Sequence, residues 1–462
     1  MKSLTKTLTR NRILLVCISI FIFSACQKQV DKPATQEEIA SAANQNKEQG
    51  HLKQTKEYSS EVATKWLDLQ LRILRIPAGG ANVFGLNSSR YFAYCGIALY
   101  ESVVPGMPAY QSLSDQLTAM PDMPNTSPGT AYHWPTCANA ALAYINKNFF
   151  SFTSSANVQS MDSLENALNL VYQTEVNAAT FNRSVDFGKA VAQLIFNWST
   201  TDGSLTFYPP YVPPVGPGLW AATPPAFLAA AGPYWGNNRL FVQGSLNGTD
   251  PAVPPPYSAD PASPYYAMVK EVYDVSQTLT PEQTAIGLYY RDAPGYVGGS
   301  HYISIFKQVL ASKQPQLDIA ALAYAKAGIA SAEAFIACWK TKYIYNVERP
   351  IKYIREVLNH PTWNALFNTP QHPDFPSGHS TNGGAVAEML TNVFGDFTFT
   401  NHTYDYLGMA PRTYQSFSEM ANEVGRSRVY AGIHYTWSCE KGTLQGKKIA
   451  QNILDKVKFL KE

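Results

Sequence analysis

Apolar residues recur along most of the chain with the spacing of an α-helix. Val62, Trp66, Leu69 and Ile73 are three or four positions apart and therefore fall on one helix face. The pair Ser88-Ser89 is expected to cap a second helix, because short hydroxyl side chains accept bonds from free N–H groups at helix starts. The same pattern predicts helices at residues 137–150, 155–176, 184–198, 265–278, 281–291, 301–312, 317–345, 377–394, 413–426 and 441–459. Because no convincing strand-like run separates the helices, we predict an all-α fold of helical bundles.

The segment 201–265 interrupts the helical pattern. It holds nearly half of the chain's 31 prolines, and proline at this density prevents both helix and central strand. Aromatic residues such as Trp220, Trp235 and Phe241 are interleaved with the prolines, which a plain linker would lack. A long ordered loop insertion that packs onto the helices is therefore favoured over disorder, and loops of this kind often shape sites.

The predicted helix at 317–345 is apolar enough to be considered as a membrane span. Asp318, Lys326 and Glu333 interrupt it, and charged residues inside a span are costly. A buried core helix is the favoured interpretation.

The first 26 residues have the layout of an export signal. Basic residues between Lys2 and Arg12 precede an apolar run, Ile13–Phe23, that is too short to cross a bilayer. The small residues and the cysteine that follow resemble a bacterial lipoprotein signal, with Cys26 as the lipidated first residue. An ordinary secretory signal or an uncleaved anchor is the alternative.

Residues 27–57 contain no Phe, Trp or Tyr and are rich in Gln, Lys, Glu and Ala. This composition predicts a flexible tether, or a helical spacer with the same effect. The folded part, residues 58–462, would then be exported and held at a membrane only by its N-terminal lipid. It would lie on the periplasmic side or at the cell surface.

Charge and cysteine content narrow the possible partners. The net charge of the whole chain is +2, and removal of the signal would bring it to about −2, which argues against nucleic acid as a partner. The cysteines that remain in the folded part show no metal-like CxxC spacing, and mostly buried free thiols are expected, with at most one disulfide. They are Cys95, Cys137, Cys338 and Cys439.

Three short motifs between residues 342 and 434 carry the candidate chemistry. They are Lys342-x6-Arg349-Pro350, Pro376-Ser377-Gly378-His379 and Ser427-Arg428-x5-His434. Arg presents a rigid fork of donors and Lys a compact charge, so these cations suit an anion with several oxygens. The second motif would lie at the start of a helix, where free N–H groups and the helix dipole attract anions. One imidazole could bond the anion's central atom while the other moves protons on the opposite side.

Each motif alone has a plain structural explanation: a solvated helix face, a Pro-Ser-Gly turn, or a surface Arg near a buried His. The occurrence of all three, in this order, favours one site that holds a tetrahedral or trigonal-bipyramidal oxyanion.

The three motifs resemble the signature shared by vanadium-dependent haloperoxidases and the acid phosphatases of the PAP2 superfamily. By motif position, the resemblance implies that Lys342, Arg349 and Arg428 neutralise the equatorial oxygens of the anion. The Ser377 hydroxyl and the Gly378 N–H would bond the same oxygens.

The resemblance also assigns the two imidazoles. His379 would be the acid–base residue, and His434 the apical ligand of vanadium or the nucleophile on phosphorus. The family pattern usually continues His-x3-Asp, but this chain has Ser438 at that position. Such an Asp would orient the imidazole, and Glu440 or a backbone carbonyl is expected to replace it. Asp374, Tyr345 and Tyr430 lie near the motifs in sequence. They could contact and support the motif residues, but packing or surface roles are favoured for them.

The resemblance supports three functions. In a vanadate-dependent haloperoxidase, hydrogen peroxide and a halide yield hypohalous acid, which attacks an organic acceptor. In a PAP2-type phosphatase, a phosphohistidine forms instead. A lipoprotein that merely binds phosphate or vanadate is the third hypothesis.

The haloperoxidase is favoured, because the chain has more helix before the motifs than a compact phosphatase needs and because a Pro- and Trp-rich insertion is familiar from that branch. Lys342 would also polarise the bound oxidant. Trp339 matches an aromatic wall of that branch, and His372 stands where bromoperoxidases have His and chloroperoxidases tend to have Phe. The resemblance thus implies a halide pocket at Trp339 and His372, with bromide or iodide as the substrate. A surface His beside Pro373 is the alternative explanation of His372.

Overall fold

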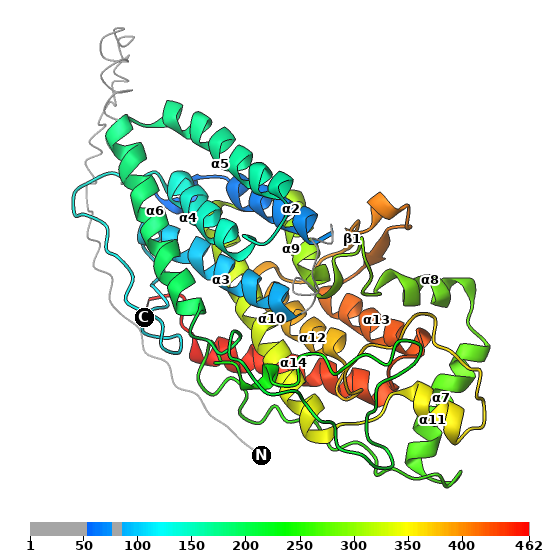
Figure 1. The fold of residues 1–462 in the computed structure, drawn as a ribbon. Coiled ribbons are helices and arrows are strands. Elements are labelled where there is room, and N and C mark those ends of the chain that lie inside the picture. Colours follow the sequence, from blue (N-terminus) through cyan, green and yellow to red (C-terminus); the bar gives the residue numbers. More distant parts are fainter. Residues whose placement is uncertain (1–52, 76–85, 462) are drawn as a thin grey trace, which may run out of the picture. The chain divides into compact units, whose positions relative to one another are not determined.

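The computed structural model describes residues 53–75 and 86–461 (Figure 1). The predicted signal, Cys26 and most of the predicted tether lie outside the described residues. The helices are α2 (Glu61–Arg75), α3 (Leu86–Val103), α4 (Trp134–Phe149), α5 (Ser155–Glu175), α6 (Ala178–Ser199), α7 (Pro264–Gln277), α8 (Pro281–Tyr289), α9 (His301–Lys313), α10 (Leu317–Tyr345), α11 (Pro350–Glu356), α12 (Gly378–Phe394), α13 (Phe417–Tyr430) and α14 (Thr436–Lys456). Short 3-10 turns cover Thr55–Glu57, Val104–Gly106, Trp235–Asn237, Gly298–Ser300 and Asp405–Leu407.

Two helical bundles share α10. On one side α10 packs against α3, which in turn packs against α4 and α6; on the other side it packs against α12, which packs against α13 and α14 (Figure 1). Gly96 on α3 and Gly328 on α10 permit a close crossing, because a side chain at either position would collide with the facing backbone. The prediction of an all-α fold built of helical bundles is confirmed.

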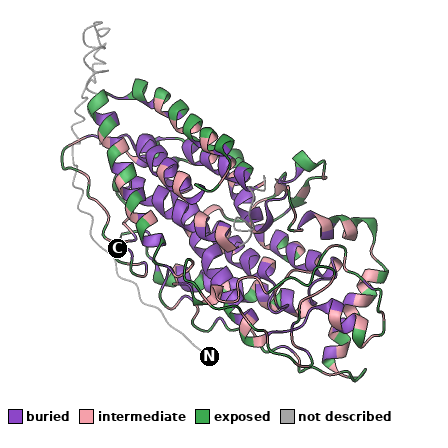
Figure 2. Ribbon diagram, viewed as in Figure 1, coloured by how far each residue is buried: buried purple, intermediate pink, exposed green. Residues whose placement is uncertain are grey.

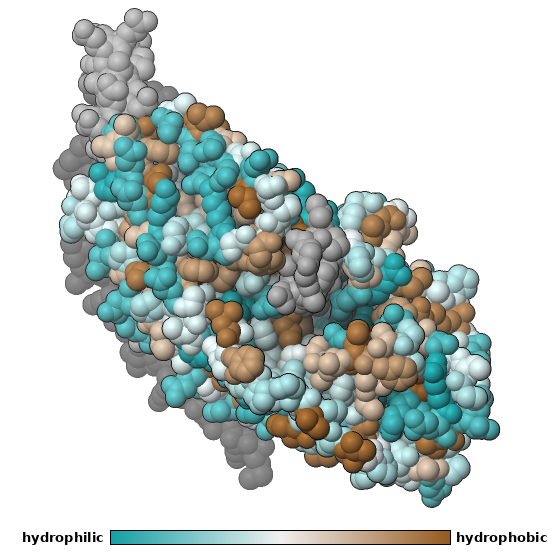
Figure 3. Space-filling model, in the orientation of Figure 1, coloured by the Kyte–Doolittle hydropathy of each residue, from teal (hydrophilic) through white to brown (hydrophobic). Residues whose placement is uncertain are grey.

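The long helix α10 forms the shared core of both bundles. It is the one helix among the described residues that is long and apolar enough to cross a membrane, but 89% of that apolar window is buried inside the protein. Figure 2 shows α10 as an almost continuous buried element, whereas α5 and α6 are exposed on their outer faces. Figure 3 shows scattered hydrophobic residues among hydrophilic ones over α5 and α6, as expected for solvent-facing helices. The interpretation of 317–345 as a core helix therefore holds.

Several local predictions were wrong. Ser88 and Ser89 lie inside α3, which begins at Leu86, and the Ser89 hydroxyl donates to the Leu86 carbonyl. A two-stranded antiparallel hairpin, β1 (Phe399–Asn401) with β2 (Arg412–Tyr414), was not predicted, and Phe399 pairs with Tyr414 in it. Strands of three residues are too short to show an alternating pattern.

The folded part also begins earlier than predicted. Thr55, assigned to the tether, is buried, and its hydroxyl donates to the Val103 carbonyl at 2.8 Å. The Trp134 indole N–H donates to the Lys53 carbonyl at 2.9 Å. Residues 53–57 therefore pack onto the ends of α3 and α4.

The Pro-rich segment 201–265 packs against the helices along only part of its length. Trp220, Phe241 and Val242 are buried, as expected of an ordered loop, whereas Phe207 and Val215 are almost fully exposed. The four cysteines in the described residues are buried free thiols, as predicted.

Candidate active site

Five helix ends bring the three motifs together. Lys342 lies in the last turn of α10, Arg349 precedes α11, and Arg428 lies in the last turn of α13. Ser377 is the N-cap of α12, and His434 stands just before α14. Terminal turns and cap residues of packed helices thus carry most of the site, on a rigid support.

The three cations are buried. Lys342, Arg349 and Arg428 are each at most 1% exposed. Burial is the main reason why the pKa of Lys342 falls to about 8 and that of Arg349 to about 10. Burial likewise lowers the pKa of Arg428. Placing three cations out of water is unfavourable unless an anion or several acceptors accompany them.

Lys342 differs in part from its predicted role. Its ammonium donates to the carbonyls of Pro373 (2.8 Å) and Asp374 (2.9 Å), and also to that of Pro376. An ammonium has three protons, so all of them are used by the loop that precedes α12. Contact with an anion oxygen would require Lys342 to exchange one of these carbonyls.

The two guanidinium groups are positioned differently. Arg349 donates from Nε to the His372 carbonyl at 2.8 Å and from Nη1 to the Ile433 carbonyl at 2.7 Å, so it links the loop before the second motif to the third motif. Arg428 donates from Nη1 to the Tyr290 carbonyl. Its Nε is buried without a hydrogen-bond partner. An unpaired, buried guanidinium donor is what an oxyanion site should show before its anion binds.

Ser377 and Gly378 form the start of α12. The Ser377 hydroxyl oxygen accepts from the Ser380 N–H at 3.4 Å and from the Ser380 hydroxyl at 3.1 Å, which leaves its own proton available for an anion. Gly378 is the first residue of the helix, where the backbone N–H has no partner within the helix. A side chain at Gly378 would press on the Trp339 ring, so glycine keeps this approach open.

His434 is a buried neutral imidazole between a carboxylate and a guanidinium. Its Nδ1 lies 2.9 Å from Asp374 Oδ1, and its Nε2 lies 3.1 Å from Arg349 Nη1. Burial, followed by the charges of Arg349 and Lys342, holds the pKa of His434 well below its usual range. A neutral ring with a lone pair on Nε2 can act as a ligand or as a nucleophile.

Asp374 was not predicted to contact the site. It is fully buried, and the Ser438 hydroxyl donates to its Oδ2. Glu440, which we expected to support His434, is exposed. The correction has a physical reason: Glu440 lies on the outer face of α14, whereas Asp374 comes from the loop that folds back under α10. Tyr345 packs on Phe375 and Tyr430 contacts Arg426, which agrees with packing and surface roles.

A second imidazole–carboxylate pair was missed altogether. His379 Nε2 lies 3.4 Å from Asp292 Oδ1, and the two side chains are 16% and 47% exposed. Burial and Arg428 lower the pKa of His379, although the carboxylate opposes them. Burial alone would raise the pKa of Asp292, but His379 and Arg428 lower it. Asp292 follows α8 and has no sequence motif of its own, so only the fold reveals it.

Trp339 and His372 form one wall beside Gly378. Their ring centroids are 4.9 Å apart, and Arg349 Nη2 lies 3.0 Å from His372 Nδ1. The Trp339 indole donates to the Ala231 carbonyl at 3.1 Å. Ala231 belongs to the Pro-rich segment, which therefore supports this wall, as expected of a long loop near a site.

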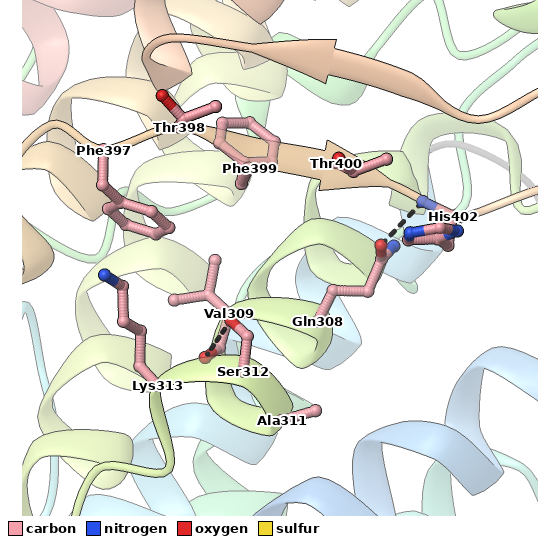
Figure 4. Close-up of a pocket in the computed structure, with 10 residues that line it drawn as sticks. All are labelled: Gln308, Val309, Ala311, Ser312, Lys313, Phe397, Thr398, Phe399, Thr400 and His402. Atoms are coloured by element: carbon pink, nitrogen blue, oxygen red, sulfur yellow. Dashed lines mark hydrogen bonds between the residues drawn. The ribbon is translucent and has the colours of Figure 1, made fainter.

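A different hollow lies between α9 and the β-hairpin. Its cavity volume is about 580 Å³, and its lining includes Lys313, Phe397 and His402 (Figure 4). Lys313 points toward the Phe397 ring, 3.8 Å from its centroid. None of the motif residues lines this cavity, so it is separate from the cationic site.

The residues present fit a bound oxyanion. A buried, partly unpaired guanidinium, a free hydroxyl proton, a helix N-terminus and a neutral imidazole converge from separate motifs. Such a donor set suits phosphate or vanadate better than a metal cation, because Arg and Lys cannot act as cation ligands.

Sequence and structure comparisons agree with this geometry. A family model described as the VCPO second helical-bundle domain matches residues 322–462. The solved structure of a bacterial vanadium-dependent iodoperoxidase is 31% identical, with a TM-score of 0.78, and the match covers 88% of this chain and 98% of that one.

The chain belongs to the vanadium-dependent haloperoxidase family. This is a family of enzymes whose cofactor is vanadate, the anion that the cationic site fits. The vanadium chloroperoxidase of Curvularia inaequalis is 29% identical over 145 residues, or 26% of this chain. The chain spans about a quarter (24%) of that protein's length. A holo-type bacterial vanadium-dependent chloroperoxidase shares the haloperoxidase fold, with a TM-score of 0.59 and 15% identity over 80% of this chain and 91% of that one.

Proposed function

We propose that the chain oxidises iodide or bromide with hydrogen peroxide to hypohalous acid, which then halogenates an organic acceptor. The balanced reaction joins hydrogen peroxide, one halide ion and one proton to give hypohalous acid and water. Peroxide gains the two electrons that the halide loses. When bound, vanadate makes hydrogen peroxide electrophilic without changing its own oxidation state.

This proposal rests on one main observation: two imidazoles in different surroundings are both influenced by the charges of the same buried cations. Arg428 and Lys342 act electrostatically on both His379 and His434. A simple anion-binding protein would need the cations and the helix N-terminus but not two imidazole–carboxylate pairs. The pairs indicate a site that both holds an anion and moves protons.

The site residues have separate roles in holding the anion and in moving protons. Arg349, Arg428, Ser377 and the Gly378 N–H would bind oxygens of vanadate, and His434 Nε2 would bond vanadium. His379 has Asp292 at its Nε2, so its Nδ1 would take a proton from hydrogen peroxide or release one to a leaving oxygen. The buried charge of Lys342 would stabilise developing negative charge in a site that excludes water.

The wall formed by Trp339 and His372 favours a large halide as the substrate. His372 Nδ1 lies 3.0 Å from Arg349 Nη2 and 3.2 Å from the Pro373 carbonyl oxygen. We propose that Nδ1 accepts from the guanidinium, which can only donate, so that a neutral ring carries its proton on Nε2. Burial, together with Lys342 and Arg349, holds the pKa of His372 well below its usual range. A polarisable halide would meet an aromatic face and one N–H donor. The 31% identical relative is described as an iodoperoxidase, which favours iodide as the first substrate to test.

The experiment loads the purified protein with vanadate and measures halogenation of a phenol reporter with hydrogen peroxide and each halide. Iodide and bromide should be oxidised faster than chloride, and vanadate-free protein should be inactive. A parallel assay uses p-nitrophenyl phosphate without vanadate, because the same donor set would also serve a phosphatase. Phosphate release without any halide oxidation would overturn the proposal in favour of the phosphatase.

A further inference from the structure

We propose that Asp374 and Ser438 together replace a single carboxylate at position 438 and fix His434 with its proton on Nδ1 and its lone pair on Nε2. Asp374 is then a positioning residue, which acts on the bound anion only through the imidazole. The proposal rests on the proposed vanadate site, but not on which halide is oxidised.

The contacts of the carboxylate carry the first step. Asp374 Oδ1 lies 2.9 Å from His434 Nδ1 without a well-aligned hydrogen bond of its own, and Ser438 donates to the other oxygen, Oδ2. The fully buried carboxylate therefore has one oxygen against His434, where a proton on Nδ1 would meet it, and one bonded to Ser438. Second-shell carboxylates of this kind fix the tautomer and the ring orientation of a ligating imidazole.

The opposite face of the ring gives the second step. Arg349 Nη1 lies 3.1 Å from His434 Nε2 and 3.5 Å from Nδ1, so it is nearer to Nε2, and it can only donate. A ring with its proton on Nε2 would set two donors against each other there and leave Nδ1 without a proton beside a carboxylate. The tautomer with Nδ1–H turns its proton toward Asp374 and its Nε2 lone pair toward the nearer contact of Arg349, and it is the one we propose.

Backbone bonds hold the carboxylate in place. The Asp374 N–H donates to the Val347 carbonyl at 2.9 Å, and the Asp374 carbonyl accepts from Lys342 at 2.9 Å. The Ser377 N–H donates to the Ser438 carbonyl at 3.0 Å, so the second motif and the start of α14 are directly linked. A carboxylate from the loop before the second motif can therefore take over a task that the usual His-x3-Asp spacing gives to the residue four positions after His434.

The test uses vanadate-free protein first. Histidine-selective ¹⁵N labelling and NMR read the tautomer of each ring, and the chain has eight histidines, so H434A can assign the signal. Wild type should show the Nδ1–H tautomer at His434, and D374N should show a mixture. An unchanged His434 tautomer in D374N would overturn the proposal.

Calorimetric titration with orthovanadate gives the second readout. D374N should weaken vanadate binding by about 10- to 100-fold, the range seen when second-shell partners of metal ligands are lost. S438A keeps the carboxylate but removes its support, so it should weaken binding in the same direction by a smaller factor. If D374N fails to fold, S438A still decides, because unchanged affinity and tautomer in S438A would contradict a joint role.

Two further variants act as controls. The double variant D374N/S438D returns a carboxylate to position 438 and should recover most of the lost affinity; no recovery would contradict the claim that the two arrangements are equivalent. E440Q changes an exposed carboxylate nearby and should leave both readouts as in wild type. Wild-type protein that shows the Nδ1–H tautomer but binds no vanadate would overturn the proposed function while leaving the tautomer assignment intact.

Discussion

The two imidazole–carboxylate pairs of this site differ in their access to water. In the pair of His434 with Asp374, the side chains are 2% and 0% exposed and lie 2.9 Å apart. In the pair of His379 with Asp292, they are 16% and 47% exposed and lie 3.4 Å apart. A buried imidazole–carboxylate pair suits a ring that must keep one protonation state, whereas a solvent-exposed pair suits a ring that exchanges protons with substrate and solvent.

This difference supports the proposed roles of the two rings, which the motifs alone do not distinguish. Both histidines belong to the same signature, and either could bond an anion. Burial and the neighbouring cations hold the pKa of His434 well below its usual range, so this ring stays neutral with a lone pair for binding. The pKa of His379 is lowered by burial and by Arg428 but raised by Asp292, so this ring remains the one that can titrate.

The largest effect is expected from H434A. Removing the His434 imidazole should abolish vanadate binding and, with it, halide oxidation, because His434 is the imidazole held between Asp374 and Arg349. Calorimetry with orthovanadate and the phenol halogenation assay measure the two losses. Full activity of a folded H434A protein would reverse the assignment of the two rings.

The matched variant H379A should behave differently. Vanadate binding should persist, while kcat falls by about 10²- to 10⁴-fold, the usual contribution of a general acid–base residue. The same two assays test this separation. If H379A loses vanadate binding as completely as H434A, His379 is also a ligand and the contrast between the two pairs is wrong.

A smaller effect is expected from R428K. Lysine keeps the charge but loses the planar fork, including the buried Nε that has no partner in the protein. Loss of a hydrogen bond to a charged group corresponds to about 1.5–3 kcal/mol, so vanadate affinity should fall by roughly 10- to 100-fold. Thermal unfolding of the vanadate-free variant serves as the control, and an unchanged vanadate affinity would show that Arg428 does not contact the anion.

The smallest effect is a shift in the pH profile of D292N. The charge of Asp292 raises the pKa of His379, so its removal should lower that pKa further. A base works only when unprotonated, so activity is lost as the pH falls through the pKa of His379, and this acid limb should move to lower pH in D292N. The profile of kcat/KM against pH, recorded at saturating vanadate, checks the direction. A limb that moves to higher pH would contradict the pairing of His379 with Asp292.

Most helices and all three motifs could be predicted from the sequence because both are local patterns. The apolar run at 317–345 matches α10 to the residue, and Ser377 caps α12 as its position in the motif suggested. The short helix Pro350–Glu356 and the hairpin were missed, since a few residues do not establish a period.

The carboxylates could not be predicted in the same way. Ser438 showed that the usual partner of His434 was missing, but nothing local distinguished Asp374 from Glu440 as its replacement. That choice depends on the loop before α12 turning back toward the start of α14. Asp292 lies far from every motif in sequence, and only the packing of α8 against α13 places it near His379.

The most direct test of the contrast between the buried His434 and the partly exposed His379 is a crystal structure of the vanadate-loaded protein. Vanadium should lie at a bonding distance of about 2 Å from His434 Nε2, as for other metal–imidazole bonds. His434 Nδ1 should still face Asp374, and His379 should contact an oxygen rather than vanadium. Vanadium bonded to His379, or bound away from both rings, would contradict the assignment.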